Sequence, residues 1–94
     1  MDHSEKNEIL LTQVVFMFQT AAMQQMGKLK NPLSDKVEKN LEQAQMSIDI
    51  LEMFHQKMKG NLSESENRMF NDVLRELKLN YVDEVTRDQK EKHD

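Results

Sequence analysis

The chain has 94 residues, of which 37% are hydrophobic and 32% are charged, with a net charge of −4 and no cysteine. A chain of this size forms one domain with a thin core, and without cysteine it lacks disulfides and thiolate metal ligands. The acidic balance argues against nucleic acid as a partner. No apolar run is long enough to span a membrane, and no basic segment precedes an apolar one as in a secretory signal, so we expect a cytoplasmic protein.

The first predicted helix covers residues 6–26 and carries two apolar faces. The larger face takes up about half of the helix circumference, and it consists of Leu10, Leu11, Val14, Val15, Met17, Phe18, Ala21 and Ala22. Three more hydrophobic residues recur at every seventh position on the opposite side, and these are Ile9, Phe16 and Met23. Gly27 is the predicted stop, since glycine adopts a left-handed backbone at low cost. This helix offers more apolar surface than one small bundle can cover.

The second predicted helix covers residues 41–59 and ends before Gly60. Two upstream stretches have the form of a capping box, residues 35–38 and residues 40–43. We prefer the second as the start of the helix, with a short turn at 35–39, but either start fits the pattern. The spacing of one apolar seam is typical of antiparallel packing, and its residues are Leu41, Ala44, Ile48, Leu51, His55 and Met58. A second apolar stripe lies away from that seam, and it consists of Met46, Ile50 and Met53.

The third predicted helix covers residues 64–87 and begins with a capping box at Ser63–Glu66. Its hydrophobic residues form one main face, made of Phe70, Val73, Leu74, Leu77, Tyr81 and Val85. The other side is charged, which indicates a wall that faces solvent. Because short linkers make neighbouring helices antiparallel, we predict an all-α fold, either a three-helix bundle or a helical hairpin with a third helix. It forms a single domain over residues 1–94 with frayed ends, 1–5 and 88–94.

Glu52 and His55 form the one motif with the pattern of a metal site. In di-iron carboxylate bundles, a Glu and a His spaced i,i+3 point inward from a helix, and two such motifs join two further glutamates. One chain has a single copy, so the site would need a dimer axis, and the first helix offers no acid after Glu8. We therefore expect no cofactor and no enzymatic activity. A metal-dependent bundle enzyme with its site at a dimer axis remains the alternative.

The chain has eight methionines, and methionine is an adaptable side chain that is common at binding surfaces. We assign Met17, Met58 and Met69 to the core. The surplus apolar stripes give the predicted self-interface, which consists of Ile9, Phe16, Met23, Met46, Ile50 and Met53. Because large apolar patches are rare on soluble monomers, we expect a homodimer or higher oligomer, or a helical client on the same stripes. A lipid surface is disfavoured, since the polar face of the first helix carries Gln and Thr in place of Lys and Arg.

Several short stretches of the chain carry a resemblance to a known family. They are Asn40–Ala44, Ile48–Met53, Lys59–Leu62, Leu74–Leu77 and Tyr81–Val82. Over about residues 9–85, the chain resembles a family of short bacterial proteins that is catalogued as a domain of unknown function, number eighteen forty-four. The resemblance implies a bacterial, cytosolic and mostly helical protein. It implies no catalytic residues, because no chemistry is established for the family.

Overall fold

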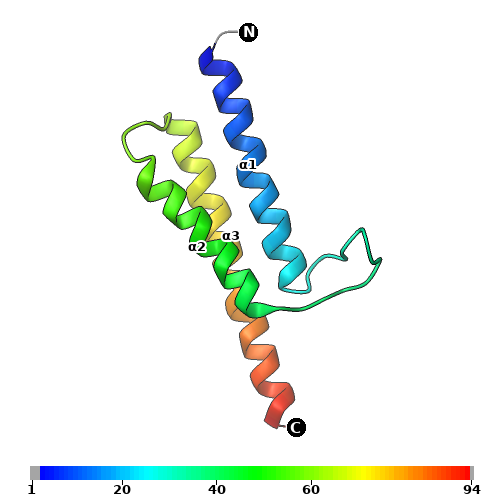
Figure 1. Ribbon diagram of the computed structural model, residues 1–94. Helices are drawn as coiled ribbons and strands as arrows, with labels where there is room; N and C mark the ends of the chain where they lie inside the picture. The colour runs from blue at the N-terminus through cyan, green and yellow to red at the C-terminus, as the bar shows by residue number, and fades with distance from the viewer. Residues whose placement is uncertain (1–2, 94) are drawn as a thin grey trace.

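The computed structural model describes residues 3–93, which form three α-helices and no β-strand. Helix α1 spans His3–Gln25, α2 spans Leu41–Lys57 and α3 spans Glu64–His93. Helices α1 and α2 lie side by side and run in opposite directions, and α3 lies behind them (Figure 1). The predicted all-α class is confirmed. The molecule is an elongated slab, with Cα extents of 55 × 27 × 16 Å, and α3 extends beyond the other two helices.

Hydrogen bonds between residues close in sequence set the C-terminal end of α1 and the start of α2. At the end of α1, the N–H of Gly27 donates to Gln24 O (3.0 Å) and the N–H of Lys28 donates to Met23 O (2.8 Å). Gly27 has φ +82°, so this is the glycine-terminated Schellman arrangement. At the start of α2, the side chain of Asn40 accepts a hydrogen bond from the N–H of Gln43 (3.1 Å). The preferred start of the second helix is therefore confirmed, and Gly27 is confirmed as the stop of the first.

Helix α3 starts at the predicted capping box and continues past its predicted end. The N–H of Ser63 donates to Glu66 Oε1 (2.8 Å), and the N–H of Glu66 donates to Ser63 Oγ (3.1 Å). The helix then runs to His93, because the residues after Arg87 include no glycine or proline that would end it. Of the ends expected to fray, residues 3–5 and 88–93 are helical, while residues 1, 2 and 94 lie outside the described residues.

The core lies between the three helices. Its buried residues are Val15, Ala22 and Met26 of α1 and its C-terminal cap, Ala44, Ile48 and Leu51 of α2, and Phe70, Val73, Leu74 and Leu77 of α3. Met58 and Met69 pack partly buried against this core, as predicted. The prediction for Met17 is wrong, since its side chain is 69% exposed. Successive helical residues are about 100° apart, so Met17 lies on the far side of α1 from the buried Val15.

The connection between α1 and α2 folds back on itself. The N–H of Asn31 donates to Lys36 O (2.8 Å), and the side chain of Asn31 accepts from the N–H of Leu33 (2.9 Å). The turn therefore lies at residues 31–36, earlier than the expected 35–39. The connection returns to α1 where the N–H of Asn40 donates to Gln25 O (2.7 Å), so both ends of this segment are held against the end of α1.

Candidate interaction surface

Two contacts show which side of α1 faces α2. The rings of Phe18 and Phe54 lie 6.2 Å apart between centroids, tilted by 58°. Two turns from Phe54 toward the start of α2, the hydroxyl of Ser47 donates to Gln25 Oε1 (2.7 Å), and this pair is partly buried. Phe18 and Gln25 are seven residues apart and share a face of α1. That face is therefore the one against α2.

Other contacts show which sides of α1 and α2 face α3. From α1, Gln19 Nε2 donates to Glu76 (3.4 Å), and Glu8 accepts from the Ser65 hydroxyl (3.1 Å). From α2, His55 lies against α3, where its ring stacks on Phe70 with a centroid distance of 5.1 Å. Helix α3 therefore covers only one side of the α1–α2 pair, and the other side has no helix on it within the described chain.

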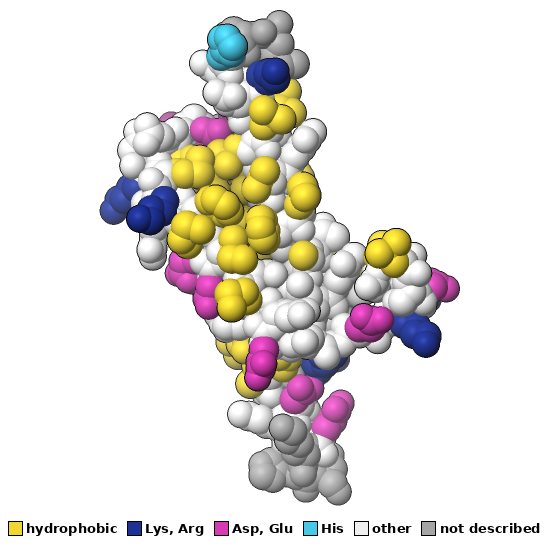
Figure 2. Space-filling view, in the orientation of Figure 1, with side chains coloured by type: hydrophobic (Ala, Val, Ile, Leu, Met, Phe, Trp, Pro, Cys, Tyr) yellow, Lys and Arg dark blue, Asp and Glu magenta, His cyan; other side chains and the backbone are white. Residues whose placement is uncertain are grey.

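The uncovered side of the α1–α2 pair carries a continuous group of hydrophobic side chains. We call this group the α1–α2 apolar surface, and it consists of Leu10, Val14, Met17, Met46, Ile50 and Met53. On α1, the three residues lie around the helix next to the face that carries Phe18, on the side away from α3. On α2, the three residues lie next to the face that carries Phe54, also on the side away from α3. Figure 2 shows the resulting gathering of hydrophobic side chains across both helices.

Exposure within this surface is high for such large side chains. Met17 is 69% exposed and Met46 is 61% exposed, while Leu10 and Met53 are 48% and 41% exposed. Val14 is exposed and Ile50 is half-buried. The α1 part of the surface is also free of charge, because no charged residue occurs from Ile9 to Gly27 in the sequence.

The six residues predicted for the interface do not form one surface. Met46, Ile50 and Met53 lie beside the exposed residues of α1, but Ile9 and Phe16 lie on the opposite flank of α1, next to α3. They are 46% and 50% exposed there. Met23 is partly buried and packs against the core. The α1 residues beside Met46, Ile50 and Met53 are instead Leu10, Val14 and Met17, which belong to the larger apolar face of the first predicted helix.

The partly buried polar pair Gln25–Ser47 is a sequence signal that could orient α1. Gln25 falls within the larger apolar face of the first helix, and Ser47 lies next to the apolar seam of the second. Buried polar side chains need hydrogen-bond partners. A polar residue in each apolar face therefore indicates that these two faces meet, which places α2 on the Gln25 side of α1 and leaves Met17 outside.

Glu52 and His55, the weak metal candidates, have separate partners on α3. The Glu52 carboxylate accepts from Lys78 Nζ (2.8 Å). His55 Nε2 lies 2.7 Å from Asn67 Oδ1, and its ring stacks on Phe70. Across residues 3–93, no three His, Asp or Glu side chains come together in a way that could hold a metal ion. The geometry of this pair is that of helix-to-helix contacts.

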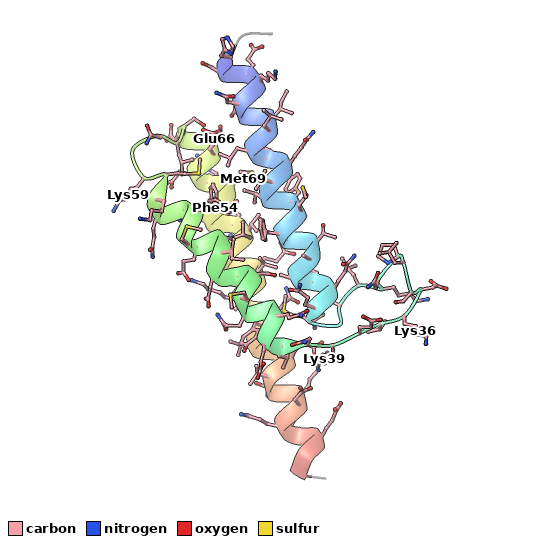
Figure 3. All side chains as sticks on the ribbon, viewed as in Figure 1. Lys36, Lys39, Phe54, Lys59, Glu66 and Met69 are labelled. Carbon is pink, nitrogen blue, oxygen red and sulfur yellow. The ribbon has the colours of Figure 1, made fainter. Side chains whose placement is uncertain are left out.

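A cluster of charges ties the connection to α3. Glu84, whose side chain is 7% exposed, pairs with Lys28 (3.3 Å) and Lys39 (3.1 Å). Lys28 also pairs with Asp83 (2.8 Å), and Lys39 also pairs with Asp88. Lys39 lies where the connection meets the bundle, whereas Lys36 projects away from the helices (Figure 3). Two lysines of the connection, Lys28 and Lys39, are thus paired with acidic residues of α3.

The charge cluster shifts the pKa of its members. Burial raises the pKa of Glu84, but hydrogen bonds from Lys39 and Lys28 outweigh burial, and the net pKa lies below its ordinary value of 4.5. The hydrogen bond from Lys28 lowers the pKa of Asp83. The hydrogen bonds to Asp83 and Asp88 raise the pKa of Lys28 and of Lys39, respectively. All four groups therefore stay charged near neutral pH.

Comparison with known proteins identifies a family and no closer relative. No curated protein matches the chain, and no solved structure matches it. None of the helices within residues 3–93 has the length and apolar character needed to cross a membrane. Residues 8–83 match the family described as "Domain of unknown function (DUF1844)", which agrees with the resemblance in the sequence. Because that match covers most of the chain, the protein belongs to this family.

Proposed function

We propose that this chain is a non-enzymatic protein-interaction module that pairs with a second copy of itself through the α1–α2 apolar surface. The observation that carries the proposal is the continuous run of exposed hydrophobic side chains across two helices. Single exposed hydrophobic residues are ordinary, but large contiguous patches mark sites of association. A bacterial cytoplasmic location, which the family resemblance implies, is part of the proposal.

The accessible surface of the chain is large enough to include an interface with a second copy. The accessible surface is 6944 Å² for a chain of 11.1 kDa, about 1,300 Å² more than a compact monomer of that mass is expected to show. Some of this excess comes from the end of α3 that extends past the bundle. A standard interface buries about 800 Å² on each partner. The excess is large enough to include one such interface.

The absence of charge on α1 favours a second copy as the partner. In a two-fold dimer, the same patch meets itself, so any charge near its centre would face a like charge. The stretch from Ile9 to Gly27 has no charged residue, although charged residues make up 32% of the whole chain. The surface is therefore compatible with its own copy. A helical client would bury the same side chains, and the experiment below separates the two.

The test is the mass of the purified protein in solution, measured by light scattering after size exclusion over a wide range of concentrations. We expect about twice the chain mass of 11.1 kDa at micromolar concentrations, with dissociation on dilution. Met46→Glu should shift the protein to the monomer. Val82→Glu is the matched control, because Val82 is on the charged side of α3 and both residues are 61% exposed. If the protein is a monomer at every concentration, the proposal is overturned, and a helical client is then the remaining partner for the surface.

A further inference from the structure

On the basis of the proposed function, we infer that Met17, Met46 and Met53 form a modification site, at which oxidation by a peroxide separates the two paired copies. These three residues are half of the α1–α2 apolar surface. Because the chain has no cysteine, methionine supplies all of its sulfur. Reversible sulfur oxidation in this chain is therefore the oxidation of methionine to its sulfoxide.

Exposure divides the methionines of residues 3–93 into two groups. The exposed group consists of Met17, Met46 and Met53, at 69%, 61% and 41%, and all three lie in the α1–α2 apolar surface. The other group is buried or partly buried in the core, and it consists of Met23, Met26, Met58 and Met69. Because a peroxide must contact the sulfur atom, it reacts first with the exposed group. Oxidation therefore reaches the proposed interface before it reaches the core.

Each oxidation transfers one oxygen atom to a thioether. A lone pair of the methionine sulfur attacks one oxygen of hydrogen peroxide, the O–O bond breaks, and water leaves after proton transfer. The sulfur loses two electrons and the peroxide gains them, so a sulfoxide forms. An apolar, flexible side chain thereby becomes a polar one whose oxygen accepts hydrogen bonds. Methionine sulfoxide reductases restore the thioether, so the change is reversible.

A sulfoxide oxygen finds no donor among the side chains of the α1–α2 apolar surface. The remaining members of this surface are Leu10, Val14 and Ile50, and none of them has a polar atom in its side chain. In a two-fold dimer the patch meets its own copy, so each methionine occurs twice in the interface. One unsatisfied buried acceptor weakens binding by about 10-fold. Oxidation of all three methionines should therefore raise the dissociation constant by about 100-fold or more.

Pairing and oxidation oppose each other, because the paired surface covers the sulfur atoms that the peroxide must reach. Oxidation acts on the free monomer and removes it from the equilibrium, so further dimers dissociate. The rate of sulfoxide formation at the three exposed methionines should therefore fall as the protein concentration rises. Met46→Glu, the expected monomer, is the control, since its Met17 and Met53 should oxidise at the same rate at every concentration.

The test compares the wild-type chain with the triple variant Met17→Leu, Met46→Leu and Met53→Leu, before and after treatment with hydrogen peroxide. Leucine is apolar and similar in volume to methionine, so the variant should still form the dimer. Peptide mass spectrometry locates the added oxygen, light scattering measures the mass in solution, and circular dichroism measures the helix content. We expect the oxidised wild-type chain to be a folded monomer of about 11.1 kDa and the triple variant to stay a dimer. Sulfoxide reductases should restore the wild-type dimer.

The order of events in the wild-type chain gives a second readout that needs no variant. Dissociation should follow sulfoxide formation at Met17, Met46 and Met53 and should precede sulfoxide formation at the fully buried Met26. Dissociation that begins only when Met26 is oxidised would overturn the inference, because damage to the core would then explain it. Loss of helix content in step with dissociation, or dissociation of the triple variant to the same extent, would overturn it for the same reason.

The remaining outcomes separate this inference from the proposed function. A wild-type dimer that persists with all three exposed methionines oxidised would overturn the inference and leave the proposed function standing. If the untreated wild-type chain is a monomer at every concentration, the proposed function fails, and the inference fails with it.

Discussion

Helices α1 and α3 are the two longest elements of the chain, and their outer sides differ in kind. Helix α3 buries one face and presents charged residues on the other, with one pair of exposed large hydrophobic residues, Leu79 and Val82, among them. Helix α1 has no charge from Ile9 to Gly27, and its exposed hydrophobic residues lie side by side. Met17 and Leu79 are almost equally exposed, at 69% and 67%. Single exposed hydrophobic residues are ordinary, whereas large contiguous patches mark sites of association, so the proposed interface rests on the continuity of the α1–α2 apolar surface and not on the exposure of any one residue.

The same phenylalanine truncation on the two helices should give the largest contrast in stability. Phe70 of α3 is 1% exposed and lies in the core, so Phe70→Ala should lower the free energy of unfolding by about 3–5 kcal/mol. Phe16 of α1 is 50% exposed, on the flank away from the α1–α2 apolar surface, so Phe16→Ala should cost less than about 1 kcal/mol. Urea denaturation of both variants checks this, and equal losses would mean that Phe16 is buried in the assembled protein.

The second prediction concerns the charge cluster that joins α3 to the connection. Glu84→Gln should lower the free energy of unfolding by about 1–3 kcal/mol, because Lys28 and Lys39 lose the partner that they share. The range lies below that of a fully buried pair, since the lysine side chains are 21% and 33% exposed. Urea denaturation at neutral pH measures the loss. A loss below about 0.3 kcal/mol would show that the cluster contributes little.

The pKa of Glu84 adds a pH dependence to the same prediction. Its pKa is lowered on folding, so its contribution to stability is present above the ordinary value of 4.5 and is lost as the pH falls through the folded value. Lys28 and Lys39 have raised pKa values, so their contribution is present below 10.5 and is lost above it. The wild-type chain should therefore lose more stability than Glu84→Gln between pH 6 and pH 3. Parallel curves for the two proteins would contradict this.

A smaller effect is expected at the end of α1, where Gly27 has φ +82°. A Cβ at Gly27 would meet only ordinary contacts, at 3.6 Å from Lys39 Cβ and Val37 Cγ1, so the cost comes from the backbone. Gly27→Ala should lower the free energy of unfolding by about 1 kcal/mol. Gly60→Ala is the matched control without nearby atoms, at φ +91°. Similar losses at both sites confirm a backbone effect, and a much larger loss at Gly27 would indicate a steric one.

The sequence predicts the parts of this structure that depend on near neighbours along the chain. Gly27, Asn40 and Ser63 each act within one turn of helix, and their roles as stop and caps follow from residue type and spacing. The orientation of α1 depends on contacts between distant residues, such as Ser47 with Gln25. The hydrophobic residues of a helical wheel with two apolar faces do not say which face meets α2, and the polar Gln25 within the larger face is the signal that points to it. The spacing of Glu84, Lys28 and Lys39 in the sequence does not indicate that they meet.

The candidate interaction surface also combines a part that near neighbours determine and a part that distant contacts determine. The stripe of Met46, Ile50 and Met53 follows from the periodicity of α2 alone, and the structure keeps it as a group on one side of that helix. Its neighbours on α1 depend on how the two helices are rotated against each other. That rotation moves Met17 from the predicted core to the surface, and it places Ile9 and Phe16 on the opposite flank.

The most direct test of the central claim is sedimentation equilibrium of two matched variants, Met17→Glu and Leu79→Glu, beside the wild-type chain. The two substitutions place the same charge at positions of nearly equal exposure, one in the α1–α2 apolar surface and one on α3. A charge at a buried dimer contact costs several kcal/mol, so Met17→Glu should raise the dissociation constant by about 100-fold or more, and Leu79→Glu should leave it unchanged. Equal dissociation constants for the two variants, or a wild-type chain of 11.1 kDa throughout, would contradict the account.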